Sequence, residues 1–350
     1  MPASRNVARD SRSVLELKSP SISLDAAGLV ALADLTTIQQ RTTLTGTAVL
    51  FDVLILCPGI HLQQESVSLN GGEYPACAAL TTGYVFRVEN PATVYYLQQV
   101  SLTGHLTNVE VSRVVPEEGL PFWDLSTFYS HNNATLLSTL AYTTSMLWTL
   151  TVILLTAMTH DWWALSVLFM LMFARLCNVI VLRRRASGKK WSGAPEPDVQ
   201  GDLLVLLSQD RWVRIKGSVD DLKKCTSGQW LRDETNVESW FIALATLSVY
   251  LAAALVSNAE SFSQILLLCL FAGSAGLLAI ANFATRDLQM HGTKLRVVGN
   301  PREYSRRKDL ADELIKETNR DDWAVRMAMI VKSKCEKCNK CDCKDVAAIM

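Results

Sequence analysis

Four long apolar segments constrain the fold of this 350-residue chain more than any other feature. They cover residues 134–158, 162–182, 240–257 and 264–284, and Arg175 is the only charged residue within them. A helix needs about 20 mainly apolar residues to cross the hydrocarbon core of a bilayer, and soluble helices of this length usually keep a polar face. The predicted fold class is therefore an α-helical membrane protein, with four transmembrane helices as two hairpins and small cytosolic α+β parts.

Charge predicts the orientation of these hairpins. The connections within them, residues 159–161 and 258–263, contain no lysine or arginine, whereas residues 183–190 and 286–308 are rich in both. Because basic residues favour the cytoplasmic side of a membrane, we expect both termini in the cytoplasm, of either plasma membrane or endomembrane. The sequon Asn133-Ala134-Thr135 and the acidic residues before it argue for the opposite orientation.

A shorter apolar run over residues 48–60 contains Asp52. We expect a buried helix or strand here, or a segment lying at the membrane surface. A fifth span over residues 44–60 is the alternative, and it would place residues 1–43 on the far side.

Arg175 and Asn178 are the candidate polar site inside the second span. An arginine in a membrane costs about 2.5 kcal/mol or more unless it finds a partner or reaches the headgroups. Two readings stay open: a functional group paired within the bundle, or a side chain that extends toward the arginines at 183–185. Asn178 lies one helical turn onward and on the same face, so it is expected to share a polar seam with Arg175.

The remaining chain predicts the domain organisation. We expect a flexible N-terminal tail at 1–43, a cytosolic β-containing region at 44–133, the hairpins at 134–182 and 240–284, a cytosolic loop module at 183–239, a strand and helix at 285–334, and a Cys-rich tail at 335–350.

Alternation of apolar and polar residues predicts the strands of these parts. Three are expected near 84–89, 94–100 and 109–114, and residues 203–207 should pair with 212–216, with 294–298 as a third strand beside them. A capped helix should begin near Ser218. A helix over 305–332 is expected to pack on the sheet; lying on the bilayer surface is the alternative.

The C-terminal tail holds the most distinctive short motif, formed by Cys335, Cys338, Cys341 and Cys343. Closely spaced thiolates suit zinc or Cu(I). S-acylation beside the membrane and solvated thiols with no specific role are the competing readings. No other cofactor is expected.

No catalytic pattern accompanies the apolar segments. The sequence lacks H-E-x-x-H, G-x-S-x-G and Walker motifs, and no histidine lies within a predicted span. We therefore expect a protein that is not an enzyme. Thirty-four basic residues balance 34 acidic ones, which argues against a nucleic-acid partner.

Three phrases carry a resemblance: QDRWVRIKGSVDDLKKCTSGQWLRD, LQMHGTKLRVVGNPREY and DLADELIKETNRDDWAVRMAM. Over about residues 130–330, the chain resembles uncharacterised multi-pass membrane proteins of filamentous fungi. The resemblance implies a eukaryotic membrane protein and transfers no activity or site residue.

These observations favour a membrane-anchored scaffold, interaction or regulatory protein, whose partners are the lipid bilayer and proteins that bind its cytosolic modules. An oligomeric channel or transporter subunit is the alternative, and a membrane-embedded enzyme comes third. The oligomeric state is not predicted.

Overall fold

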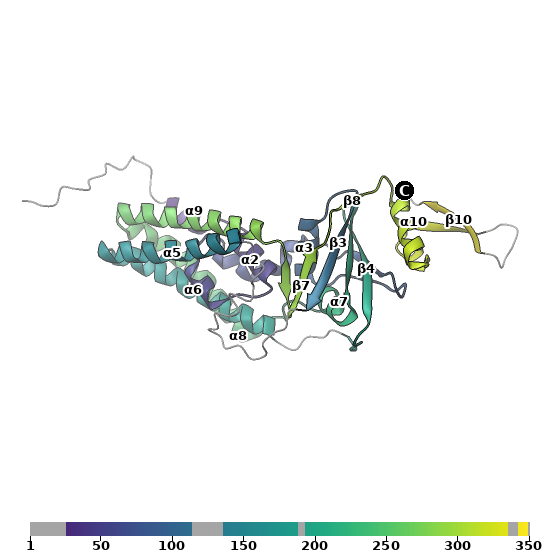
Figure 1. The fold of residues 1–350 in the computed structure, drawn as a ribbon. Helices are drawn as coiled ribbons and strands as arrows, with labels where there is room; N and C mark the ends of the chain where they lie inside the picture. Colours follow the sequence, from purple (N-terminus) through teal and green to yellow (C-terminus); the bar gives the residue numbers. More distant parts are fainter. Residues whose placement is uncertain (1–25, 114–135, 188–192, 335–341, 349–350) are drawn as a thin grey trace, which may run out of the picture.

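The computed structural model describes residues 26–113, 136–187, 193–334 and 342–348. Figure 1 shows an elongated helical bundle at one end, a sheet in the middle and the C-terminal elements beyond the sheet. The long apolar segments therefore separate in space from the strand-rich ones.

Four of the described helices are long and apolar enough to cross a membrane, as the sequence predicts. They are α5 (Leu136–Met158), α6 (Trp162–Ser187), α8 (Asn236–Leu255, extended by η3, Val256–Asn258) and α9 (Ser261–Ala284). Helix α5 packs on α9 and α6 on α8, so the sequential hairpin partners are not the closest neighbours. Helix α8 begins before the predicted residue 240, because Thr235 and Glu238 form a capping box at its start.

The N-terminal segment packs against this bundle, which corrects the predicted flexible tail and rules out the alternative of a fifth span. It forms α1 (Ala26–Ala31), α2 (Thr37–Thr45) and the 3₁₀ segments η1 (Leu50–Leu54) and η2 (Ile60–Asn70). Residues 26–31 and 37–43 are thus helical although the sequence predicts a flexible tail, because α1 and α2 bury apolar side chains against α9. Residues 44–60 form no fifth span: η1 is one short 3₁₀ segment packed on α5 and α6.

One eight-stranded sheet collects residues from three parts of the described chain. The strands are β1 (Ala76–Ala79), β2 (Val85–Arg87), β3 (His105–Arg113), β4 (Gln200–Leu207), β5 (Arg211–Ser218), β6 (Leu288–Met290), β7 (Thr293–Val297) and β8 (Arg302–Glu303). Their order is β2-β1-β4-β5-β3-β7-β6, with β8 also on β3, and only the β3–β5 pair is parallel. The predicted β4–β5 hairpin is confirmed, whereas β7 lies against β3 instead of against that hairpin.

The expected strand at 94–100 is wrong, because these residues form helix α3 (Pro91–Val100). The Asn90 side chain accepts hydrogen bonds from the backbone N–H of Ala92 (3.1 Å) and Thr93 (3.3 Å), and Pro91 occupies the first turn. Asparagine as an N-cap followed by proline starts a helix. The sequence pattern alone predicts a turn at Asn90-Pro91, after a strand, whereas the two residues begin a helix.

The two faces of the sheet bury different elements, because side chains alternate along each strand. Leu203 and Val213 pack with α3, the end of α6 and α7 (Val219–Thr226). The predicted capped helix is confirmed, and of the serine and aspartate at its start the serine, Ser218, is the cap. Leu204 and Trp212 face the opposite layer, formed mainly by α10 (Arg307–Thr318) and α11 (Asp322–Arg326). The helix expected over 305–332 is thus broken after Thr318, and it packs on the sheet. Strands β9 (Ile330–Lys334) and β10 (Asp342–Ala348) form a separate antiparallel pair.

Candidate functional site

Arg175 lies at the centre of a buried polar cluster where α6 meets the N-terminal segment. Its side chain is 1% exposed. The guanidinium donates from Nε to the backbone oxygen of Asp52 (3.1 Å) and from Nη1 to Oε1 of Gln63 (2.5 Å). The structure therefore turns Arg175 into the bundle, toward η1 and η2, and not toward the end of α6.

Asp52 extends the cluster to α5. One carboxylate oxygen accepts the hydroxyl hydrogen of Tyr142 (2.6 Å), and the other accepts the backbone N–H of Val49 (2.8 Å). The guanidinium of Arg41 lies over the Tyr142 ring, 5.2 Å from its centroid. The buried Asp52 carboxylate is thus held by one hydroxyl and one backbone N–H, so both of its oxygens have a hydrogen-bond partner.

Asn178 and Arg185 continue the polar face of α6 toward the sheet. The Asn178 amide donates to the backbone oxygen of Ile60 (3.0 Å), and Gln64 donates to Asn178 Oδ1 (3.2 Å). Arg185 in turn donates to Gln64 Oε1 (3.0 Å) and to the backbone oxygen of Arg232 (2.9 Å). Arg175 and Asn178 therefore share a seam on one helix face but do not bond to each other in the structure.

The seam has a clear physical task. Segments η1 and η2 are 3₁₀ segments, and a carbonyl oxygen in them can accept a second hydrogen bond besides that of the backbone. The Asp52 oxygen accepts the Ile55 N–H (3.0 Å) and Arg175 Nε (3.1 Å), and the Ile60 oxygen accepts from the Asn178 amide. These bonds from α6 tie the backbone of the N-terminal segment to the bundle.

The sequence pointed to Arg175 and Asn178, but not to their partners Gln63 and Gln64 or to the bond between Tyr142 and Asp52. The single clue was Asp52, a charge inside an apolar run. Asp52 and Gln63 each lie more than 100 residues from Arg175 in the sequence. No local sequence pattern links them to it.

The predicted metal site cannot be placed. Cys335, Cys338 and Cys341 lie outside the described residues, and Cys343 belongs to β10. Among the described residues, no group of three or more histidine, cysteine, aspartate or glutamate side chains is arranged to hold a metal ion. Zinc or Cu(I) binding by the tail stays a prediction.

A groove runs beside the outermost strand of the sheet. Its volume is about 560 Å³, and its lining includes Tyr84 and Phe86 of the β2 region, Leu203 of β4 and Leu222 of α7. The Tyr84 and Phe86 rings stack with centroids 5.9 Å apart, and Tyr84 is 64% exposed. This groove is thus apolar and open, unlike the closed polar cluster around Arg175.

Comparisons with protein-family models, curated proteins and solved structures found no match for this chain.

Proposed function

We propose that this chain is a membrane-anchored interaction protein: four helices cross the bilayer, and the sheet offers one edge to a protein partner in the cytoplasm. The observation that carries the proposal is the outer edge of β2, which pairs with no other strand among the described residues and lies beside the apolar groove.

Membrane placement is supported by the outer surface of the bundle. Large apolar side chains face outward on each of three helices: Leu147 and Leu154 on α5, Trp240 on α8 and Phe283 on α9, all at least 60% exposed. Soluble proteins rarely expose an apolar surface of this extent. Lipid would cover these side chains, while the irregular η1 and η2 backbone is satisfied inside the protein.

The charges at the two ends of the bundle support the orientation. Arg184 and Arg185 lie in the last turn of α6, at the end next to the sheet. At the other end, Asp161 caps α6 through Ala164 N–H (3.1 Å) and also accepts the Glu260 N–H (2.8 Å), which ties the two hairpin connections together. Basic residues at the sheet end favour a cytoplasmic sheet.

The register of β2 leaves backbone groups available for a partner. Ala79 N–H donates to the Tyr84 oxygen (2.8 Å) and Val88 N–H donates to the Pro75 oxygen (3.0 Å), so the odd-numbered residues between them direct their N–H and C=O away from β1. These are Val85 and Arg87. An extended peptide can pair with such an edge and insert an apolar side chain into the neighbouring groove.

Accessibility labelling tests the placement. In sealed cells, with the exposed native cysteines replaced by serine, an impermeant maleimide should reach a cysteine introduced by Asn258→Cys if the protein is at the plasma membrane. It should label Ser187→Cys only after permeabilisation. Labelling of position 187 from outside would overturn the orientation.

Cross-linking in native membranes, read by quantitative mass spectrometry, tests the partner edge. Val85→Pro removes an outward N–H, a change that an edge strand tolerates, and Tyr84→Ala removes the exposed ring. Both should deplete the cross-linked proteins, whereas Tyr74→Ala, at another half-exposed tyrosine, should not. Unchanged cross-links in both variants would refute the edge, and ion flux through proteoliposomes would favour a channel or transporter subunit.

A further inference from the structure

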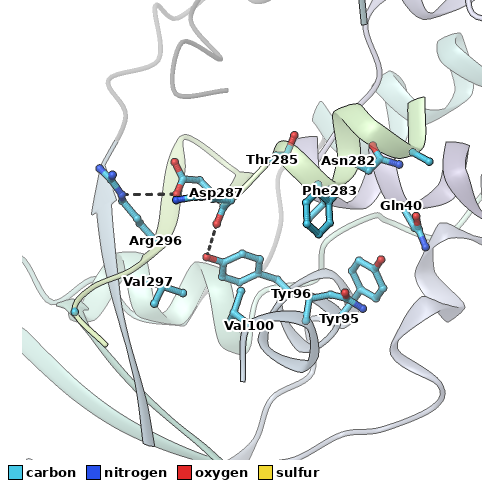
Figure 2. Close-up of a pocket in the computed structure, with 15 residues that line it drawn as sticks. Gln40, Tyr95, Tyr96, Val100, Asn282, Phe283, Thr285, Asp287, Arg296 and Val297 are labelled. Atoms are coloured by element: carbon cyan, nitrogen blue, oxygen red, sulfur yellow. Dashed lines mark hydrogen bonds and ion pairs between the residues drawn. The ribbon is translucent and has the colours of Figure 1, made fainter. Parts of the chain in front are cut away.

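A second pocket lies where α9 leaves the bundle and meets the sheet. Its volume is about 740 Å³. Figure 2 shows its two ends: Phe283, Gln40 and Tyr95 lie together at one side, and Asp287 and Arg296 lie at the other. The pocket thus lies between the outer surface of the helical bundle, at the end of α9, and a charged surface of the sheet.

The apolar wall belongs to the surface that faces lipid in the proposed placement. Phe283 is 90% exposed on the last turn of α9, and Ala279, one turn earlier, also lines the pocket. Leu44 of α2 closes this wall from the other side. These apolar side chains offer a surface along α9 on which a hydrocarbon chain can lie, and Gln40 and Asn282 also line this side of the pocket.

The polar wall carries a surplus of positive charge. Oδ2 of Asp287 lies 2.8 Å from Nζ of Lys294, and both side chains are at least 92% buried, so this acid is already neutralised. Arg296 is 68% exposed and reaches Asp287 Oδ1 only at 3.9 Å. Arg286 is exposed at the same rim. Two guanidinium groups therefore retain N–H donors for an anion.

The floor between the two walls is fixed in position. The Tyr96 hydroxyl donates to the backbone oxygen of Arg286 (2.9 Å), which holds the segment after α9 against α3 (Figure 2). Arg41 donates to Oγ1 of Thr285 (3.1 Å) from the α2 side. The arginines thus project from a backbone anchored to both the bundle and the sheet, so the pocket does not depend on a loose loop.

We infer that this pocket binds an anionic phospholipid of the surrounding bilayer, with its phosphate on Arg286 and Arg296 and an acyl chain along Ala279 and Phe283. Guanidinium groups pair with phosphate oxygens through parallel hydrogen bonds. The cytoplasmic leaflet, where the proposed orientation places the pocket, is the one rich in anionic lipids. The inference rests on the proposed membrane placement but not on the partner edge of β2.

Native mass spectrometry of the full chain, released from nanodiscs, tests the inference. Nanodiscs contain either dioleoyl-phosphatidylcholine alone or the same lipid mixed with dioleoyl-phosphatidylserine. The wild-type chain should retain phosphatidylserine after delipidation and should retain much less phosphatidylcholine. Equal retention of the two lipids would overturn the selection for an anion.

Matched variants locate the lipid. The double change Arg286→Gln and Arg296→Gln should reduce retained phosphatidylserine at least tenfold, and Ala279→Trp should do so by filling the apolar wall while leaving both arginines. Arg87→Gln with Arg306→Gln, two exposed arginines elsewhere on the sheet module, should match the wild type. Retention that survives Ala279→Trp, or that inorganic phosphate displaces, would show a soluble phosphate site and overturn the lipid assignment.

Failure of the lipid site and failure of the membrane placement give different results. If maleimide labelling contradicts the orientation, the pocket faces the leaflet that is not the one rich in anionic lipids. If labelling supports the placement while all arginine variants retain phosphatidylserine equally, only the pocket assignment is wrong.

Discussion

Two buried arginines, Arg175 in the bundle and Arg214 in the sheet, are held by different kinds of partner. Arg175 is bound by neutral acceptors, a backbone carbonyl and the Gln63 amide. Arg214, 8% exposed, is bound by two carboxylates, with Nη2 2.7 Å from Asp202 Oδ2 and Nη1 2.6 Å from Glu317 Oε2. In the bundle an arginine fixes irregular backbone, whereas in the sheet it joins charged side chains from β4 and α10.

The difference follows from the surroundings of each arginine. Glu317 is 45% exposed, so water screens the Arg214 cluster and remains available to its carboxylates. Burial lowers the pKa of Arg214, but the hydrogen bonds to Asp202 and Glu317 outweigh it and raise that pKa. Asp52 and Gln63, the partners of Arg175, are both at least 95% buried. Water therefore cannot replace the hydrogen bonds that they would lose if Arg175 were removed.

Removing the bundle arginine should therefore have the largest effect. Arg175→Leu leaves Gln63 Oε1 without a donor and removes one of the two donors to the Asp52 carbonyl. This loss should destabilise the protein by about 1–3 kcal/mol. A fall in the apparent Tm in detergent measures it. Arg184→Leu is the matched control on the same helix, since Arg184 is 64% exposed. Equal Tm values for the wild type and Arg175→Leu would mean that the seam does not hold the N-terminal segment.

The sheet arginine should matter less. Arg214→Met breaks two ion pairs, but its partners regain water, so we expect a loss of about 1–2 kcal/mol. Arg302→Met serves as the control, because Arg302 is 63% exposed and pairs with Glu313 at the surface. Chemical denaturation followed by tryptophan fluorescence reports the loss. A larger loss for Arg214→Met than for Arg175→Leu would reverse the comparison between the two regions.

The sheet should also respond to acid through Asp221. Burial alone would raise the pKa of this carboxyl, but hydrogen bonds from Ser218, Arg113 and Lys224 outweigh it and lower the pKa below its usual value. A lowered folded pKa contributes stability above the unfolded pKa, about 3.9, and that contribution disappears as the pH falls through the folded pKa.

Asp221→Asn should accordingly be less stable than the wild type at neutral pH, by about 1 kcal/mol. The gap should close as the pH is lowered below about 4. Tm values of the wild type and of Asp221→Asn, measured from neutral pH to below about 4, give the difference in stability at each pH. Asp198→Asn, at an exposed aspartate, is the control. A gap that stays constant with pH would show that ionisation of Asp221 does not contribute to stability.

Local patterns determined much of this protein. The length and apolarity of four segments predict four long helices without reference to any other part of the chain, because a helix satisfies its own backbone. The β4–β5 hairpin and the capped helix that begins after Ser218 were also predictable from the sequence, because each depends on residues within about 20 positions of one another.

Other features depended on residues far apart in sequence. Residues 94–100 are rich in β-forming side chains, yet Asn90 and Pro91 begin a helix there, and the buried face of that helix packs on the sheet. Strand β3 pairs in parallel with β5 and antiparallel with β7, an order that no hairpin dictates. Strand order is set by which apolar faces can be buried together, and that is a property of the whole fold.

Arg175 shows the same division most clearly. The sequence alone determined that a charge lies within an apolar helix, and it left open whether that charge is paired in the bundle or extends toward residues 183–185. Only the tertiary structure decided that the partners are Gln63 and the carbonyl of Asp52, because the N-terminal segment folds back into the bundle as irregular backbone. The cost of burying a charge can be recognised from the local sequence. The groups that hydrogen-bond to that charge are brought to it by long-range packing, and this packing produces no periodic pattern in the sequence.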